Sequence, residues 1–189
     1  IAAEVALVRG EPVVRRSAVW EFPADVSDTT LCGKALRRFL SARGFTGGRV
    51  VAGIPARWVL AREKTVPACD DAALAGLVRL EAERDFMLPG DSPALDFIEG
   101  PRGGDGSRRL VVFAIPSAKL EWVRAFLRAA GFGAAALTVS VVSAMPPGQG
   151  GCWCCLHVGR EGAACAVYVD GLPVRVKQVA GVPPDAEQG

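Results

Sequence analysis

The sequence holds a single histidine among 189 residues, which excludes any metal site built from several imidazoles. The sequence also lacks a large excess of either charge, because 22 lysines and arginines are nearly balanced by 20 aspartates and glutamates. The formal net charge is +2. The chain is therefore not of the strongly basic kind that binds nucleic acid, and we expect no such partner. No apolar run reaches the roughly 18 residues that a membrane-spanning helix needs, so we expect no transmembrane segment.

Six cysteines are present, but their spacing does not follow that of zinc ligands. Four of them lie late in the chain, without the two CxxC pairs that bring thiolates to one ion, as Cys152, Cys154, Cys155 and Cys165. Neighbouring residues of a strand point to opposite faces, so Cys154 and Cys155 do not reach one ion together. We predict no metal and interpret the cysteines as small buried apolar residues in a reducing compartment.

The chain does contain apolar residues at the periods of both strands and helices. Half of its residues are hydrophobic and 22% are charged, which is enough to bury a substantial core. Helices are expected at 31–43, 72–87 and 117–131, with Asp28 and Asp70 near the starts of the first two. Strands are expected at 4–9, 12–22, 49–55, 57–66, 94–99, 109–115, 134–142, 152–158, 163–169 and 172–179. This order predicts a mixed α/β chain, with residues 65–138 as a compact unit of their own.

Charge is distributed unevenly along the chain. Residues 1–64 carry 11 basic and 6 acidic side chains, residues 65–138 carry 8 and 10, and the remainder carries 3 and 4. A basic first part suits an acidic partner or a membrane surface. Because the charges are spread and form no basic block, we interpret them as the solvated face of a helix.

Three segments, in this order, carry a resemblance to a known family. They are Arg62–Pro67 (REKTVP), Leu80–Pro89 (LEAERDFMLP) with Asp96-Phe97 after it, and Val111–Pro116 followed by Glu121–Val139. Together they resemble the actin-like platform proteins of type IV pili and type II secretion, namely PilM and the cytoplasmic part of GspL. The resemblance extends from Glu4 to Val182, and the chain begins without Met, as the interior of a longer gene does.

The resemblance implies a partial actin-like fold of RNase H-like topology with an inserted βαββαβ-type subdomain. Residues 1–64 are then expected to form the first part of the first actin-like subdomain, and residues 65–138 the insert. Residues 139–189 are expected to return to the first subdomain and to open the β-hairpin series of the next lobe. The family also implies a cytoplasmic location, peripheral to the bacterial inner membrane.

The implied function is that of a non-catalytic assembly adaptor. Such a protein binds the cytoplasmic N-terminal peptide of a bitopic inner-membrane protein of the PilN type, and an assembly ATPase is a further expected partner. The peptide groove is expected between the first subdomain and the insert, with walls from Arg57, Trp58, Arg62, Glu81 and Arg84. Trp58 suits an apolar anchor for the peptide or, alternatively, a place in the core.

Members of this family cradle nucleotide phosphates in D-x-G turns. The matching segment here is Leu156–Gly162, which retains Gly159 and Gly162 but has His157 at the acidic position. Imidazole is a poor ligand for Mg²⁺, and we interpret His157 as an ordinary strand residue beside a turn and not as a catalytic residue. We therefore predict a degenerate phosphate loop, no catalytic residue and no cofactor. Binding of ATP and magnesium is expected only if the full-length protein supplies the rest of the site.

Two alternatives stay open at this point. A sugar kinase-like phosphotransferase of the same superfold would need a general-base aspartate and intact phosphate loops. A GspL-type secretion scaffold would differ mainly in a transmembrane helix downstream. The paired carboxylates Glu81 and Asp85 share a helix face, and we interpret them as salt-bridge partners of neighbouring arginines.

Overall fold

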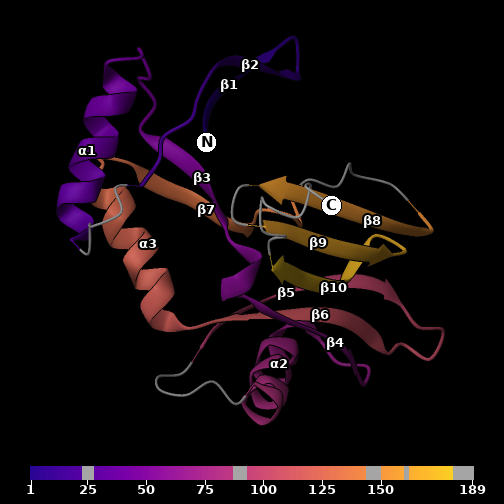
Figure 1. Cartoon of the computed structure of the whole chain (residues 1–189). Coiled ribbons are helices and arrows are strands. Elements are labelled where there is room, and N and C mark those ends of the chain that lie inside the picture. The colour runs from indigo at the N-terminus through magenta and orange to yellow at the C-terminus, as the bar shows by residue number, and fades with distance from the viewer. Residues whose placement is uncertain (23–27, 87–92, 144–149, 160–161, 181–189) are drawn as a thin grey trace, which may run out of the picture. The chain divides into compact units, whose positions relative to one another are not determined.

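In a computed structural model, the residues that the structure describes form small sheets and three α-helices (Figure 1). The structure describes residues 1–22, 28–86, 93–143, 150–159 and 162–180. Two compact units are present, and each is built from two stretches of chain: residues 1–52 with 120–137, and residues 53–119 with 138–189. The first unit takes in most of the third helix and of the strand after it, so its limits differ from those expected for the insert. The insert at 65–138 stays a prediction.

The first unit begins with a hairpin of β1 (Ala2–Val8) and β2 (Glu11–Ala18). Arg9 and Gly10, with φ of 55° and 87°, form the left-handed turn that suits such hairpins. The first unit also holds α1 (Thr29–Ser41) and most of β3 (Arg49–Ile54), α3 (Ser117–Ala129) and β7 (Gly133–Val139).

Asp28 caps the N-terminus of α1 and so fixes where this helix begins. Asp28 accepts hydrogen bonds from the backbone N–H groups of Thr30, at 2.7 Å, and Leu31, at 3.3 Å. Gly44, with φ of 77°, follows the end of the helix. The core of the first unit is formed by Leu40, Ala130 and Phe132, against which Leu36, Phe39, Phe45 and Val50 pack.

The second unit contains a three-stranded antiparallel sheet in the order β4-β6-β5. Its strands are β4 (Leu60–Val66), β5 (Ala94–Arg102) and β6 (Arg108–Ile115), and α2 (Asp71–Asp85) packs on one face. Asp70 caps α2 through the N–H of Ala73 at 2.7 Å. The core beneath α2 consists of Val66, Leu74, Val78, Ala82, Phe86, Leu110, Val112 and Ala114.

A buried arginine joins three elements of this sheet. Arg108 is 2% exposed, and its Nε and Nη2 atoms donate to the Glu99 carboxylate at 2.9 and 2.5 Å. Its Nη1 atom donates to the Cys69 carbonyl at 3.2 Å and lies 2.7 Å from the Asp71 carboxylate. The hydrogen bond from Arg108 lowers the pKa of Glu99. The guanidinium therefore holds β5, β6 and the start of α2 together.

The second unit ends in a meander of β8 (Cys152–Gly159), β9 (Gly162–Val169) and β10 (Leu172–Ala180), in the order β10-β9-β8. The Asp170-Gly171 turn between β9 and β10 has positive φ at both residues, as the sequence pattern predicts. Tyr168 is buried here with Ala164 and Ala166, and its hydroxyl donates to the Val142 carbonyl at 2.6 Å.

Several sequence-based expectations are wrong in detail. The expected strand at 57–66 starts only at Leu60, because a short 3-10 helix, η1 (Ala56–Trp58), occupies its beginning. The helix expected at 31–43 spans Thr29–Ser41, and Leu31 near its start, which fits the apolar period of the sequence, is 62% exposed, since Cys32 and Gly33 turn inward instead. Cys152 and Cys154 are exposed and not buried, because they lie on the outer side of the edge strand β8.

Candidate functional site

The five residues predicted to line a peptide groove all belong to the second unit. They lie in two separate places, one on η1 and one at the contact of β4 with α2. Arg57 and Trp58 lie on η1, just before β4 begins. Arg62, Glu81 and Arg84 gather where β4 runs past α2.

Trp58 is half-buried and lies beside two cationic side chains. The Arg57 guanidinium lies 6.0 Å from the centre of its ring, and the Lys119 ammonium lies 5.2 Å from it. Both distances are within the range of a cation–π interaction. The indole is therefore neither a pure core residue nor a fully exposed one, and part of its surface remains open to a ligand.

The second place is a set of five charged residues that we call the charged flank: Arg62, Lys64, Glu81, Arg84 and Asp85. Arg62 pairs with Val112 and Lys64 with Leu110 in the sheet register. Directly opposed residues share a face of the sheet, and both partners belong to the core beneath α2. Arg62 and Lys64 therefore stand on the side of the sheet that α2 covers.

Ion pairs connect the two elements across this flank. Lys64 bridges from β4 to the carboxylates of Glu81, at 3.3 Å, and Asp85. On the helix itself, Arg84 approaches the same two carboxylates at 3.8 and 3.7 Å. The flank is thus a compact alternation of positive and negative charge, which suits a segment that carries both polar backbone groups and a few charges.

The pKa values on the flank follow from these contacts. The hydrogen bond from Lys64 lowers the pKa of Asp85, and the charges of Lys64, Arg84 and Arg62 act in the same direction. The hydrogen bond to Asp85 raises the pKa of Lys64, with a further contribution from Glu81. Both shifts favour the ionised forms, so Lys64 and Asp85 form an ion pair near neutral pH.

Lys64 and Asp85 were missed as site residues by the sequence reasoning. The signal for each was present, because Lys64 follows Arg62 at the two-residue spacing of one strand face. Asp85 follows Glu81 at the four-residue spacing of one helix face. The interpretation of these carboxylates as salt-bridge partners of neighbouring arginines is incomplete, because the lysine of β4 is the shared partner of both.

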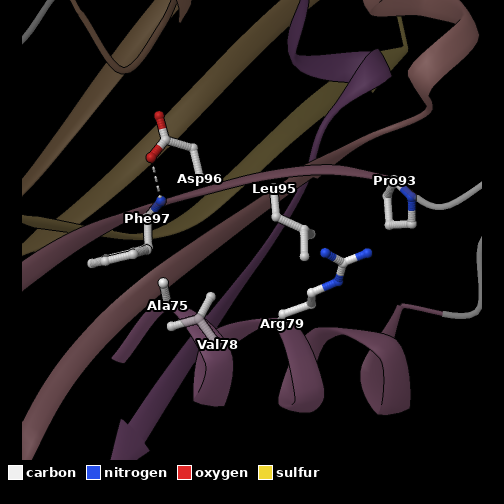
Figure 2. Close-up of a pocket in the computed structure, with 7 residues that line it drawn as sticks. All are labelled: Ala75, Val78, Arg79, Pro93, Leu95, Asp96 and Phe97. Atoms are coloured by element: carbon white, nitrogen blue, oxygen red, sulfur yellow. Dashed lines mark hydrogen bonds between the residues drawn. The ribbon is translucent and has the colours of Figure 1, made fainter. Parts of the chain in front are cut away.

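A small pocket lies on the other flank of α2, between the helix and β5 (Figure 2). It has a volume of about 320 Å³ and is lined by Ala75, Val78, Arg79, Pro93, Leu95, Asp96 and Phe97. The Asp96 carboxylate accepts the backbone N–H of Phe97 at 2.8 Å, on the strand that ends the sheet. None of the predicted groove residues lines this pocket, although the Asp-Phe pair of the second motif does.

The predicted phosphate loop lies at the end of the β8–β9 hairpin. Gly159 and Gly162 face each other in the register, and His157 is exposed opposite Ala164. Arg160 and Glu161 lie outside the described residues, as do Met87–Pro89 of the second motif. Along the described part of the hairpin, residues 152–159 and 162–169, the sequence holds no carboxylate, so these residues do not fit Mg²⁺, which prefers oxygen ligands.

Metal-binding and membrane-spanning features were sought throughout the part of the chain that the structure describes. No group of three or more histidine, cysteine, aspartate or glutamate side chains is arranged there to hold a metal ion. Among the same residues, none of the helices is both long enough and apolar enough to cross a membrane.

The chain was compared with protein-family models, curated proteins and solved structures, and the solved structures support its predicted fold. No protein-family model matches the chain, and no curated protein matches it either. A chain of the solved PilM-PilN type IV pilus biogenesis complex superposes with a TM-score of 0.80 at 19% sequence identity, covering 94% of this chain. The chain has the partial actin-like fold that the resemblance implies. The resemblance found in the three motifs is thereby confirmed, as is the predicted α/β class.

A second solved structure agrees with the first. The cytoplasmic domain of EpsL, an inner-membrane component of the type II secretion system of Vibrio cholerae, superposes with a TM-score of 0.58 at 14% identity over 79% of this chain. The present chain spans 57% of the length of each of these two chains.

Proposed function

We propose that this chain belongs to an assembly adaptor of a type IV pilus or type II secretion platform, at the cytoplasmic side of the bacterial inner membrane. The observation that carries this proposal is the superposition with a chain of the PilM-PilN complex over 94% of the residues. The likeness to the cytoplasmic domain of an inner-membrane secretion component supports the same location. In this proposal the partner is a bitopic protein of the PilN type, bound through its cytoplasmic N-terminal peptide.

The charged flank and Trp58 are the surface on which we place this peptide. Strand β4 is an edge strand of its sheet, and in the described part of the chain its hydrogen-bonded neighbour is β6. Leu60, 45% exposed, pairs with Ala114 and so stands on the same face as Arg62, which follows it by two residues. Leu60 and Arg62 thus offer an apolar and a charged contact in succession along β4, and Trp58 of η1 comes just before them in the chain, as a site for an extended peptide requires.

The energetic roles of the two places differ in this proposal. Burial of the half-exposed Trp58 ring supplies most of the affinity, since tryptophan is prominent among interface residues that dominate binding. Arg62 and Lys64 favour a peptide that places one carboxylate beside them. Glu81 and Asp85 repel a second carboxylate on the same peptide. Ordering of a flexible tail offsets part of the contact energy, so we expect a micromolar Kd.

Two arginines of α2 provide a matched test. Arg84 lies on the charged flank beside Glu81, whereas Arg79 lies on the pocket side of α2 and pairs with Glu83 at 3.4 Å. In titrations of the cytoplasmic N-terminal peptide of the neighbouring bitopic protein, Trp58→Ala should weaken binding tenfold or more. Arg84→Ala should weaken it several-fold, and Arg79→Ala should leave it unchanged. Equal losses for Arg79→Ala and Arg84→Ala, or no binding by the unsubstituted chain, would contradict the proposed site.

We also propose that this part of the protein performs no phosphoryl transfer. The described strand residues of this hairpin, 152–159 and 162–169, hold no carboxylate, which supports this proposal because phosphoryl transfer depends on a metal to neutralise the phosphates. Calorimetry with magnesium and ATP should show no binding for the chain or for its His157→Asp variant. Micromolar binding by the unsubstituted chain would favour the phosphotransferase alternative.

A further inference from the structure

The outer surfaces of α1 and α3 are rich in positive charge. On α1, Lys34, Arg37 and Arg38 are exposed and follow each other at three- and four-residue spacing, opposite the buried Cys32 and Leu40. A helix of this kind therefore presents its three cations on a single face. The sequence of α1 contains no acidic residue to balance them.

Helix α3 presents a similar face. Arg124 and Arg128 are exposed and four residues apart, whereas Val123, Phe126 and Leu127 point into the core. Glu121 is the acidic residue in the sequence of this helix, and it lies 2.9 Å from Arg124. Arg128 is left without an acidic neighbour on its own helix.

Helices α1 and α3 approach each other at one place in the first unit, where the start of α1 meets the end of α3 (Figure 1). Gly33 of α1 approaches α3 so closely that an added Cβ atom would lie 2.6 Å from the Cβ atom of Ala129. The guanidinium of Arg37 lies 5.3 Å from the ring of Phe132, just beyond the end of α3. Six exposed charged residues of the two helices, five cations and one carboxylate, make up what we call the basic face: Lys34, Arg37, Arg38, Glu121, Arg124 and Arg128.

A cluster of aromatic side chains, which we call the aromatic border, lies in the same unit as the basic face. Trp122 and Phe126 of α3 stack at 5.5 Å, and Phe22, from the segment after β2, lies 6.1 and 5.3 Å from them. Trp20 joins this cluster at 4.8 Å from Phe22. Phe22 is nonetheless 56% exposed, and Val19 and Leu31 are exposed by 67% and 62%. A partly exposed aromatic cluster beside cations is typical of side chains that lie at the level of lipid headgroups.

We propose that the basic face, with its aromatic border, binds the surface of an anionic lipid membrane. The cations contact lipid phosphates, and Phe22 and Leu31 enter the headgroup region. An acidic protein or a nucleic acid would use the cations alone, so the exposed aromatic and aliphatic side chains beside them favour a membrane. This surface lies in the first unit and includes none of the residues proposed for peptide binding, so it stands independently of that function.

The expected strength follows from the number of cations. Each lysine or arginine close to an anionic membrane strengthens binding roughly fivefold at low ionic strength. The double variant Lys34→Glu/Arg38→Glu should therefore lower the vesicle partition coefficient by about 25-fold or more. Added salt should weaken binding of the unsubstituted chain, because the Debye length falls to about 3 Å at 1 M.

The chain offers a control with an identical change of charge. Arg175 and Lys177 are exposed on β10 in the second unit, and Arg175→Glu/Lys177→Glu alters one arginine and one lysine in the same way. In co-sedimentation with phosphatidylcholine vesicles that contain an equal part of phosphatidylglycerol, this control should retain most of the binding. Vesicles of phosphatidylcholine alone should bind neither the chain nor its variants.

Tryptophan emission tests the contribution of the aromatic border. In a Trp58→Phe/Trp153→Phe background, Trp20 and Trp122 are the two that remain of four tryptophans, and both belong to the cluster. Their emission should shift to the blue on binding to the anionic vesicles. Equal losses for the two charge-reversal variants would overturn the proposal. Binding to polyglutamate or duplex DNA, but not to anionic vesicles, would also overturn it in favour of an acidic macromolecule.

Discussion

The packing of α1 on α3 can be tested with one substitution made at two glycines. Gly33 and Gly76 both lie inside helices, where alanine is favoured over glycine by about 1 kcal/mol. An added Cβ atom at Gly76 meets nothing within 4 Å. At Gly33 the same atom would lie 2.7 Å from the Phe126 carbonyl oxygen and 2.9 Å from the Ala130 nitrogen, besides its contact with Ala129.

The two substitutions should therefore differ in sign. Gly76→Ala should stabilise the second unit by about 1 kcal/mol, because the helical preference acts without opposition. At Gly33 two of the crowded atoms are backbone, so α3 has to move, and overpacking of this kind costs about 2 to 3 kcal/mol. After subtraction of the helical preference, Gly33→Ala should destabilise the first unit by about 1 to 2 kcal/mol.

Urea unfolding measures both effects. With a slope of about 2 kcal/mol per molar urea, the midpoint should fall by about 0.5 to 1 M for Gly33→Ala and rise by about 0.5 M for Gly76→Ala. Far-UV circular dichroism follows the helices, while in the Trp58→Phe/Trp153→Phe background the emission of Trp20 and Trp122 reports on the first unit. A stabilising Gly33→Ala would show that α1 and α3 do not approach this closely. The basic face would then lose its structural basis.

Two further predictions follow from the titratable groups. Because Lys64 lowers the pKa of Asp85, this carboxylate stabilises the second unit above about pH 4 and ceases to do so as pH falls through its lowered value. Urea midpoints measured against pH should thus show a smaller acid loss for Lys64→Met than for the unsubstituted chain, and an unchanged acid loss would contradict the ion pair. Burial raises the pKa of Tyr168 to about 12, so stability should fall as pH rises above about 10, where the unfolded phenol ionises. The chain has one tyrosine, so absorbance titration reads it directly, and ionisation near pH 10 in the folded chain would refute its burial.

Local signals in the sequence were sufficient to predict most of the elements. Asp28 and Asp70 mark the starts of helices because each satisfies backbone N–H groups that the first turn leaves unpaired. Asp170-Gly171 marks a hairpin because both residues tolerate positive φ. Such signals depend on the few residues beside them, so the chain's tertiary structure does not alter them.

The features that sequence reasoning missed depend on residues far apart in the chain. Leu31 follows the apolar period of α1, yet Gly33 is buried instead, since a close approach to α3 leaves no room for a side chain. Lys64 and Glu81 are 17 residues apart and meet because α2 packs on the face of the sheet to which Lys64 points. No periodicity within either element indicates that contact.

The basic face could not be predicted from the charge of the sequence, because folding brings into one unit charges that lie far apart in the chain. Counted along the sequence, the positive charges of residues 1–64 are spread, and Arg124 and Arg128 belong to a stretch with more acidic than basic residues. Helical spacing first brings Lys34, Arg37 and Arg38 onto one side of α1, and Gly33 then allows the end of α3 to approach the start of α1 closely. The acidic side chains that balance residues 65–138 lie mostly in the second unit, around α2 and β5. A nearly neutral chain therefore carries a locally basic surface, so its net charge of +2 is no argument against binding to an anionic membrane.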